Sequence, residues 1–453
     1  MVKVGFYGAA GEVTGSNFLI DSGTHKYVVD CGLFQGADVV TEHNDDPFVY
    51  NPAEVTAVII THAHLDHIGR LPMLVKNGFR GSIYATEATI ELTGLTLKDA
   101  LEIMTNRAER DNQPILYNEV DLRRTLDLFQ PVPYHQQQKL AGEDSFTLYD
   151  SGHILGSASV LLEAGGKKIA FSGDIGFWPN TLLPEPESPI EADMVVTEAT
   201  YGGVNHADQR NRIEVLKEAL NWTIAHRGVL LIPAFAVERS QELLYLLNYL
   251  FNQHQLPKMP IYLDSPLAIE ALEVFERHQE LFAKEVQKLR QTDNDIFSFH
   301  GLVLTPTSAD SRDINQMEPP KVIIAGSGMM EGGRIHHHLK RYLPRDNTLL
   351  LVIGYQAENT FGHRLISGAQ EVMILGDRIP VRAKIEVVDI FSGHADDREL
   401  RKWLKAIKLQ KSGRIMIVHS NPERAKNYQA ELIKEMPDRT IEIAEIGQSQ
   451  EVI

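Results

Sequence analysis

Residues 58–69 read VIITHAHLDHIG, a short apolar run followed by a dense group of histidines. Such a β-branched run is typical of a buried strand. A strand that ends in His-x-His would place the imidazoles of His62 and His64 on the same side of the chain, one pleat apart. Asp66 and His67 are then expected at the start of a following helix. Imidazoles gathered with a carboxylate favour zinc over calcium or magnesium, which prefer oxygen ligands.

Two later loops offer further ligands, which are needed because four side chains cannot complete the coordination of two metal ions. His153 lies in SGHILGS at residues 151–157, and Asp174 lies in SGDIG at residues 172–176. Taken alone, His153 is as readily a loop residue bonded to backbone, and Asp174 a turn residue. Beside the histidine group both become candidate ligands, because loops at strand ends gather in a layered fold.

Composition limits the class of protein. The chain has 453 residues and a formal net charge of −17, which suits a globular protein of two or three domains. Its single cysteine, Cys31, excludes a disulfide scaffold and a thiolate-rich zinc site. The first residues lack the pattern of a signal peptide, and no run of about 18 apolar residues occurs, so we expect a cytoplasmic protein with no membrane partner. The acidic total argues only mildly against nucleic acid, because a basic cleft can lie in an acidic body.

The pattern of expected helices and strands changes twice along the chain. The first part is rich in strands, whereas long amphipathic helices alternate with single apolar strands from Arg210 onward, which predicts a parallel, doubly wound α/β unit. The last residues return to short strands, such as that expected at 383–388. The simplest organisation is one domain interrupted by another, with boundaries at 1–206, 207–378 and 379–453.

The sequences HAHLDH, SGHILGS and SGDIG, in this order, resemble the metallo-β-lactamase fold. The resemblance implies an αββα sandwich with two zinc ions at one edge of its sheets. Asp30 occupies the position of an aspartate that supports the metal site without binding it. The implied ligands are, for one ion, His62, His64 and His153, and, for the other, Asp66, His67 and a later histidine, with Asp174 bridging.

Three further segments indicate which branch of the metallo-β-lactamase superfamily the chain resembles. TEATYG at 197–202, FSGHAD at 391–396 and IVH at 417–419 look like the three signatures of the β-CASP nucleases. Nearly the whole chain is covered, and the insert would be the β-CASP domain. The chain resembles the prokaryotic homologues of the nuclease in the mRNA 3′-end cleavage and polyadenylation specificity factor. RNA-directed members carry histidine at the third signature, so His419 indicates RNA and supplies the later ligand. One departure is Ser420-Asn421, where the family usually has Gly-Glu.

The resemblance also implies a mechanism. A phosphodiester is an anion with a poor leaving group, and two zinc ions would activate a bridging water and neutralise charge on the phosphate oxygens. His394 is the candidate general acid, and Glu198 the carboxylate that keeps it protonated and oriented. Asp66 is expected to be a catalytic residue as well as a metal ligand.

A glycine-rich segment, GSGMMEGGR at 326–334, follows an apolar run and precedes an expected helix. Backbone amides at such a junction can cradle an anion, although a tight turn is the equal alternative. Ser327 and Arg334 are the candidate contacts to substrate phosphates.

The function expected from the sequence is that of a zinc-dependent ribonuclease that hydrolyses single-stranded RNA. The alternatives are a DNA nuclease of the same fold, a small-molecule metallo-hydrolase and a non-catalytic scaffold subunit. A homodimer is left open.

Overall fold

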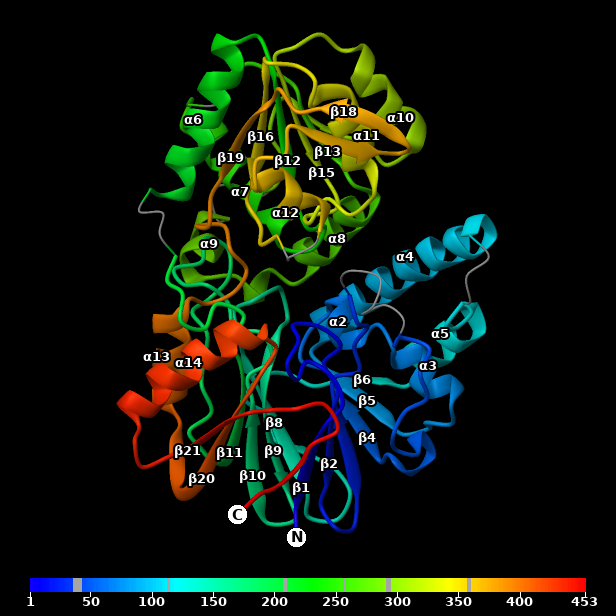
Figure 1. Cartoon of the computed structure of the whole chain (residues 1–453), viewed down its shortest axis with the longest axis vertical. Coiled ribbons are helices and arrows are strands. Elements are labelled where there is room, and N and C mark those ends of the chain that lie inside the picture. The colour runs from blue at the N-terminus through cyan, green and yellow to red at the C-terminus, as the bar shows by residue number, and fades with distance from the viewer. Residues whose placement is uncertain (36–42, 112–114, 207–209, 256, 291–294, 357–359) are drawn as a thin grey trace. The chain divides into compact units, whose positions relative to one another are not determined.

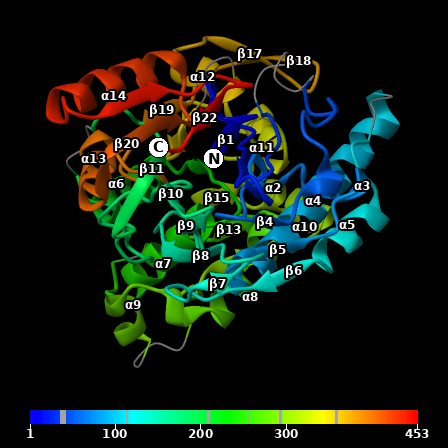
Figure 2. The same ribbon diagram turned by 90° about the horizontal axis from the view of Figure 1, so that it is seen from below.

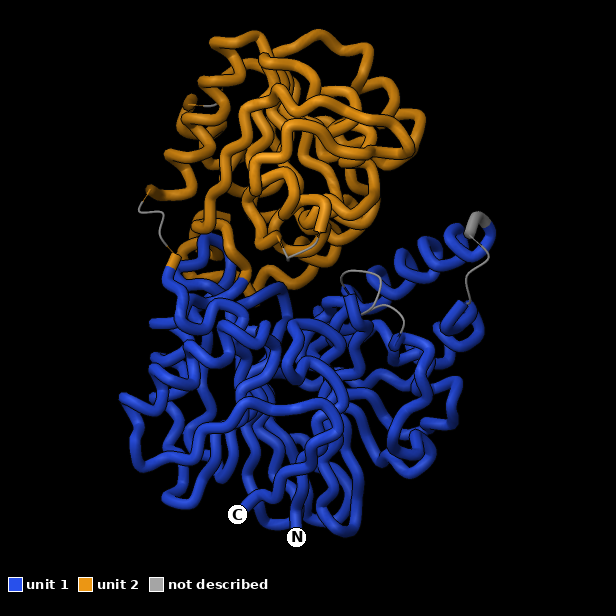
Figure 3. Tube along the Cα trace, in the orientation of Figure 1, with its two compact units in different colours: residues 1–205, 394–453 blue, residues 206–393 orange. Residues whose placement is uncertain are grey.

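The computed structural model describes residues 1–35, 43–111, 115–206, 210–255, 257–290, 295–356 and 360–453 (Figure 1). These residues form two compact units (Figure 3). Unit 1 comprises Met1–Asn205 and His394–Ile453, and unit 2 comprises His206–Gly393. Unit 2 is therefore an insertion in the chain of unit 1.

Unit 1 is built on two seven-stranded sheets. The first contains, in spatial order, β22 (Ser449–Glu451), β1 (Lys3–Phe6), β2 (Phe18–Asp21), β3 (Lys26–Val29), β4 (Ala57–Ile59), β5 (Ser82–Ala85) and β6 (Phe129–Pro131). The second contains β21 (Thr440–Ile443), β20 (Lys408–Val418), β11 (Glu191–Glu198), β10 (Lys167–Phe171), β9 (Ala158–Ala164), β8 (Ser145–Asp150) and β7 (Gln138–Lys139).

One hydrophobic core fills the space between these sheets. Alternate residues of both sheets contribute to it, because successive side chains of a strand point to opposite faces. The rings of Phe18 and Phe171, one from each sheet, stack with their centroids 5.9 Å apart.

Helices cover the outer faces of the sandwich. They are α2 (Leu65–Ile68), α3 (Leu71–Lys76), α4 (Glu87–Asp111), α5 (Glu119–Leu126), α13 (Asp397–Ala406) and α14 (Pro422–Glu435), with the 3-10 turn η1 (Pro52–Glu54). On the second sheet, Leu400 and Trp403 of α13 and Tyr428 of α14 pack in a core with Val195 and Ile415 of the strands beneath. Helix α13 begins with a capping box, in which Asp396 and Glu399 satisfy each other's backbone N–H groups. The expected αββα sandwich is confirmed.

Unit 2 is a parallel six-stranded sheet with helices packed on it, as the strand–helix alternation predicted. Its strands, in spatial order, are β14 (Leu302–Leu304), β13 (Ile261–Asp264), β15 (Lys321–Ala325), β12 (Val229–Pro233), β16 (Thr348–Val352) and β19 (Lys384–Val387), beside a hairpin of β17 (Glu371–Ile374) and β18 (Asp377–Pro380). Its helices are α6 (Arg212–Ala225), α7 (Arg239–Asn252), α8 (Pro266–Arg277), α9 (Lys284–Leu289), α10 (Ser308–Asp313), α11 (Arg334–Tyr342) and α12 (Phe361–Ile366), with 3-10 turns η2 (Gln279–Leu281) and η3 (Ile314–Gln316).

The return to unit 1 differs from the expected boundary. The sequence places residues 379–393 in the last part of the sandwich, but in the structure they belong to unit 2. The reason is that β19 pairs in parallel with β16 and completes the sheet of the insert. The first crossing lies beside residues 207–209, which are outside the described part of the chain.

The two ends of the chain lie side by side in unit 1 (Figures 1 and 2). They are joined because β22 pairs antiparallel with β1, and Val452 donates a backbone hydrogen bond to Val2. None of the described helices combines the length and the apolar character of a membrane span.

Candidate metal and catalytic centre

The histidine group lies just beyond β4, in a loop and not on the strand. Strand β4 ends at Ile59, so the expected pleated placement of His62 and His64 is wrong. The chain leaves the sheet at Thr61, because its N–H and hydroxyl both donate to the carboxylate of Asp30, each at 2.8 Å. Helix α2 begins after His64, and Asp66 falls in its first turn, as expected.

A first cluster of candidate ligands contains His62, His64, His153 and Asp174, whose ligand atoms all lie within 4.8 Å of one another. His64 Nδ1 lies 3.1 Å from Nε2 of His62 and 3.1 Å from Nε2 of His153. Asp174 Oδ2 lies 3.4 Å from His62 Nε2 and 3.6 Å from His153 Nε2. Four side chains from three separate loops therefore converge.

A second cluster contains Asp66, His67 and His419. His419 Nε2 lies 3.3 Å from Asp66 Oδ2, across a sequence separation of 353 residues. Asp174 lies beside this cluster too, because its Oδ1 is 3.3 Å from His67 Nε2 and 3.7 Å from His419 Nε2. Its two oxygens thus face different clusters, which suits the bridging position that the resemblance implied.

The residues of both clusters fit divalent metal ions. A tetrahedral zinc ion with Zn–N distances of about 2.0–2.1 Å holds its ligand nitrogens about 3.3 Å apart, close to the spacing around His64. Asp174 is only 2% exposed, and its Oδ1 accepts no hydrogen bond of good geometry from the described residues, with His67 Nε2 at 3.3 Å as its nearest ion-pair partner. A buried carboxylate oxygen costs free energy unless a partner compensates it, and a cation is such a partner.

Burial also keeps His62 and His64 of the first cluster in the neutral form that binding to a metal ion requires. It lowers the pKa of His64 to about 4. Burial, followed by the charge of His67, holds the pKa of His62 well below its usual value. Both rings are therefore neutral at pH 7, with a lone pair available for a metal ion.

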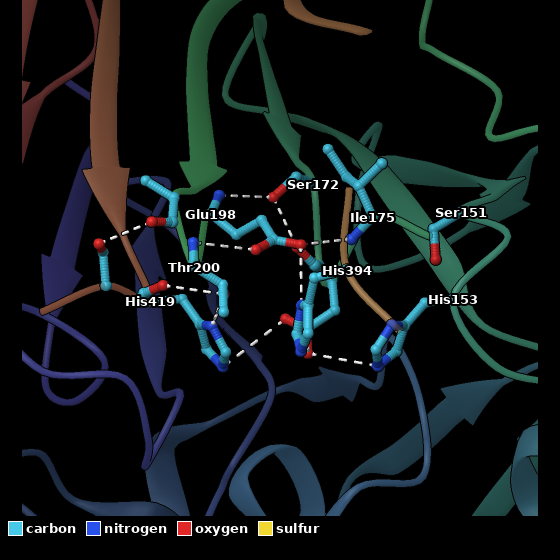
Figure 4. Close-up of polar contacts among 12 residues, drawn as sticks. Ser151, His153, Ser172, Ile175, Glu198, Thr200, His394 and His419 are labelled. Carbon is cyan, nitrogen blue, oxygen red and sulfur yellow. Dashed lines mark hydrogen bonds and ion pairs between the residues drawn. The ribbon is translucent and has the colours of Figure 1, made fainter. Parts of the chain in front are cut away.

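Polar neighbours fix the orientation of the candidate ligands. His67 Nδ1 lies 2.7 Å from Asp30 Oδ2, so Asp30 supports the cluster as expected. Thr200, for which the sequence predicts no role, lies 2.9 Å from His419 Nδ1 through its hydroxyl and donates to the carbonyl of His419 (Figure 4). Ser157 accepts the backbone N–H of His153 at 3.0 Å. Hydroxyl residues of this kind are common in loops, so the sequence carried no signal that singled them out.

His394 and Glu198 form a pair beside the clusters (Figure 4). His394 Nδ1 lies 3.3 Å from Glu198 Oε1 and 4.0 Å from Asp174 Oδ2. Glu198, at the end of β11, is 0% exposed, and its carboxylate accepts the backbone N–H groups of Ile175 and Thr200. Burial opposes the charged form of His394, but the nearby carboxylates outweigh it, Glu198 most and then Asp174 and Asp66, so the pKa of His394 is raised. The expected acid and its orienting carboxylate thus lie in contact.

The departure Ser420-Asn421 has a structural role. Asn421 is the N-cap of α14, and its side chain accepts the backbone N–H of Arg424 at 2.9 Å. Ser420 donates its hydroxyl to the carbonyl of Ala199 at 2.7 Å. The turn after His419 is therefore held without the carboxylate that the family usually has there.

The two candidate phosphate contacts lie in unit 2. The guanidinium of Arg334 donates to Asp264 at 2.7 Å and to the carbonyls of Thr305 and Pro306. Ser327 Oγ accepts the backbone N–H of Glu331 at 3.0 Å. Both side chains thus have partners within unit 2, and their contact with substrate stays a prediction.

Comparison with known proteins matches most of the chain to three family descriptions. Residues 10–221 match the metallo-beta-lactamase superfamily, residues 240–365 the Beta-Casp domain, and residues 378–443 the Zn-dependent metallo-hydrolase RNA specificity domain. A crystal structure described as a protein of unknown function from Enterococcus faecalis V583 shares the fold, with a TM-score of 0.55 at 10% identity over 99% of each chain.

Two relatives of similar length carry ribonuclease or RNase in their names, and a longer relative is named a transcription termination factor. Ribonuclease TTHA0252 of Thermus thermophilus is 40% identical, over 92% of this chain and 93% of that protein. An RNase J-like protein of Methanocaldococcus jannaschii is 31% identical, over 92% of each. Transcription termination factor FttA of Methanosarcina mazei is 30% identical over 97% of this chain and 70% of the longer relative. The chain therefore belongs to the metallo-β-lactamase superfamily and, within it, to the β-CASP family of ribonucleases.

Proposed function

We propose that the protein is a zinc-dependent ribonuclease that hydrolyses phosphodiester bonds of single-stranded RNA, with two zinc ions and His394 as general acid. The observation that carries the proposal is the placement of Asp174. Its oxygens face two clusters of candidate ligands, and the His394–Glu198 pair lies beside it. A binuclear centre with an adjacent proton donor suits the hydrolysis of a phosphodiester.

The seven side chains of the two clusters would hold the metal ions, with Asp174 between them. When bound there, zinc ions supply Lewis acidity, which lowers the pKa of a coordinated water and neutralises negative charge on the phosphate. The protein's own part is to keep His62 and His64 neutral by burial and to orient the other ligands through polar neighbours. Thr200 contributes here, because its hydroxyl donates to the carbonyl of His419 and so can accept Nδ1–H, which leaves Nε2 to face Asp66.

His394 would donate a proton to the departing oxygen. Because its Nδ1 faces Glu198, Nε2 is the nitrogen that transfers the proton. The buried Glu198 carboxylate favours the charged imidazolium before the transfer and fixes the ring plane. General acid catalysis of this kind typically contributes about 10²–10⁴-fold.

RNA is favoured over DNA by two observations of different kinds. Two of the relatives reported above carry the words ribonuclease or RNase in their names. His419 also stands at the third signature, where RNA-directed members have histidine. The cytoplasmic location and a homodimer remain predictions of the sequence.

The test is cleavage of matched single-stranded RNA and DNA of the same base sequence, end-labelled, before and after dialysis against a chelator. The proposal predicts rapid cleavage of RNA, loss of activity after chelation, and recovery with zinc but not with magnesium. Equal cleavage of both strands would support the DNA-nuclease alternative. Activity that survives complete removal of metal would contradict the proposal.

A further inference from the structure

Three charged side chains lie together in the interior of unit 2. Glu242 of α7 is 0% exposed, and its carboxylate lies 2.5 Å from Arg239 Nη1 and 3.2 Å from Arg212 Nε. Arg239 and Arg212 are themselves only 5% and 7% exposed. We call these three residues the arginine clamp. Buried charges are costly unless they are paired and hydrogen-bonded, so this group needs a physical reason.

Helix stability does not supply that reason. Arg239 is the first residue of α7, and Arg212 is the first residue of α6. The N-terminus of a helix carries partial positive charge, so a cation in the first turn is unfavourable there. Arg239 pairs with Glu242 inside α7, but both arginines also make contacts outside their own helices, and these account for cations at such unfavourable positions.

Those contacts go to the segment that leads out of unit 2. Arg212 Nε donates to the carbonyl of Ile390 at 2.7 Å, and Arg239 Nη1 donates to the carbonyl of Phe391 at 3.2 Å. The Phe391 ring is fully buried, with the Arg212 guanidinium 5.9 Å from its centroid. Two consecutive peptide groups are thus held by the arginine clamp.

Only Ser392 and Gly393 separate these peptide groups from His394. On its other side, the same segment is fixed within unit 1, where Ala395 donates to the carbonyl of Ile175 at 2.8 Å and His394 pairs with Gly176 in a β-bridge. The backbone that carries His394 is therefore anchored both before and after the ring, and the arginine clamp provides the anchor before it.

We propose that the arginine clamp is a positioning device for His394, so that buried charges of unit 2 set the efficiency of proton donation. The proposal deepens the proposed function and rests on it, because it requires His394 to act as the acid. Loss of one donor would let the segment shift, and a displacement of about 1 Å at a reacting group can cost about 100-fold in rate. Arg239 and Arg212 belong neither to the two clusters of candidate ligands nor to the His394–Glu198 pair.

The test is a double-mutant cycle on the full-length, zinc-loaded enzyme. Arg239→Gln should lower kcat for RNA about 10–100-fold and leave KM within about twofold. In the His394→Ala background the same change should have almost no further effect, because a misplaced acid and a missing acid fail in the same step. Arg239→Lys, which retains a donor and the charge, should lose less activity than Arg239→Gln.

A matched control is Lys321→Met, which removes another buried charge of unit 2. Lys321 Nζ donates to the carbonyls of Ile314 and Met317, each at 2.6 Å, and not to the segment before His394. It should lower the thermal stability but leave kcat within about twofold in both backgrounds. Glu242→Gln keeps the shape of the arginine clamp and replaces Arg239→Gln if that variant does not fold.

The outcomes separate the two proposals. If Arg239→Gln lowers kcat by the same factor with and without His394, the arginine clamp does not act through the acid, and the positioning proposal is wrong. If His394→Ala alone retains full rate, the assignment of the acid fails instead, whatever the arginine variants do.

Discussion

His394 is held between two opposing influences, burial that disfavours its charged form and a carboxylate that favours it. The His394→Ala variant should therefore lose about 10²–10⁴-fold in kcat, because the leaving oxygen would depart without a proton. The metal content should stay at that of the wild type, since His394 belongs neither to the cluster of His64 nor to that of His67 and groups instead with Asp174 and Glu198. Single-turnover cleavage and elemental analysis measure the two quantities. Full activity in this variant would refute the assignment of the acid.

Asp66 links two distant parts of the chain, because it lies in the first turn of α2 and faces His419, which follows β20. The Asp66→Ala variant should lose both activity and bound metal, since one cluster would keep only two protein ligands of its own. Elemental analysis of the purified protein checks this directly. His135→Ala is a suitable control, because His135 is an exposed histidine paired with Glu187, and it should keep the full metal content. Unchanged zinc stoichiometry in Asp66→Ala would contradict the ligand assignment.

Asp150, at the end of β8, makes the stability of unit 1 depend on pH. Burial raises the pKa of this carboxyl from 3.8 to about 7, although its Oδ1 accepts the N–H of Gly152. The folded state therefore holds a proton that the unfolded state releases. The stability from this group is complete below about pH 3.8 and is lost as the pH rises through about 7.

Replacement of Asp150 by asparagine tests this dependence, because asparagine keeps the acceptor but cannot ionise. The free energy of unfolding of the variant, relative to wild type, should rise between pH 5.5 and pH 8 by about 2 kcal/mol, because the wild type loses about 1.4 kcal/mol per pH unit up to the raised pKa of about 7 and nothing further above it. Chemical denaturation at several pH values measures it. A difference that does not change with pH would show that Asp150 ionises normally in the folded protein.

Among the helices, α14 shows how one N-cap residue stabilises the turn that follows a candidate ligand. Asn421 caps this helix two residues after His419, so Asn421→Ala should cost about 1 kcal/mol of stability. Asn421→Asp, which keeps the cap, should cost much less. Thermal unfolding of both variants compares them. Equal melting temperatures for Asn421→Ala and wild type would mean that the cap contributes nothing.

The elements also show where sequence reasoning succeeds and where it stops. The apolar runs predicted β4 and β19 as strands, because side-chain pattern is local information. The sheet that β19 joins depends on its pairing with β16, which no local pattern specifies. Likewise, the histidine spacing predicted a cluster, but the exit of the chain at Thr61 depends on Asp30, a partner 31 residues earlier.

At the scale of the whole molecule, the candidate site assembles from distant parts of one chain. Helix α2 contributes its residues near the beginning, whereas His394 and His419 follow the entire insertion of unit 2. The resemblance of the motifs to a known family predicted which residues would meet, whereas the motifs taken singly left His153 and Asp174 open. Distances, and supporting hydroxyls such as that of Thr200, required the folded structure.

The central claim is that these side chains hold two zinc ions on either side of Asp174. Anomalous scattering from crystals of the zinc-loaded protein, recorded above and below the zinc absorption edge, tests it most directly. The account predicts two anomalous peaks, one among His62, His64 and His153 and the other among Asp66, His67 and His419, with Asp174 contacting both. A single peak elsewhere, or imidazoles that point away from one another around empty density, would contradict it.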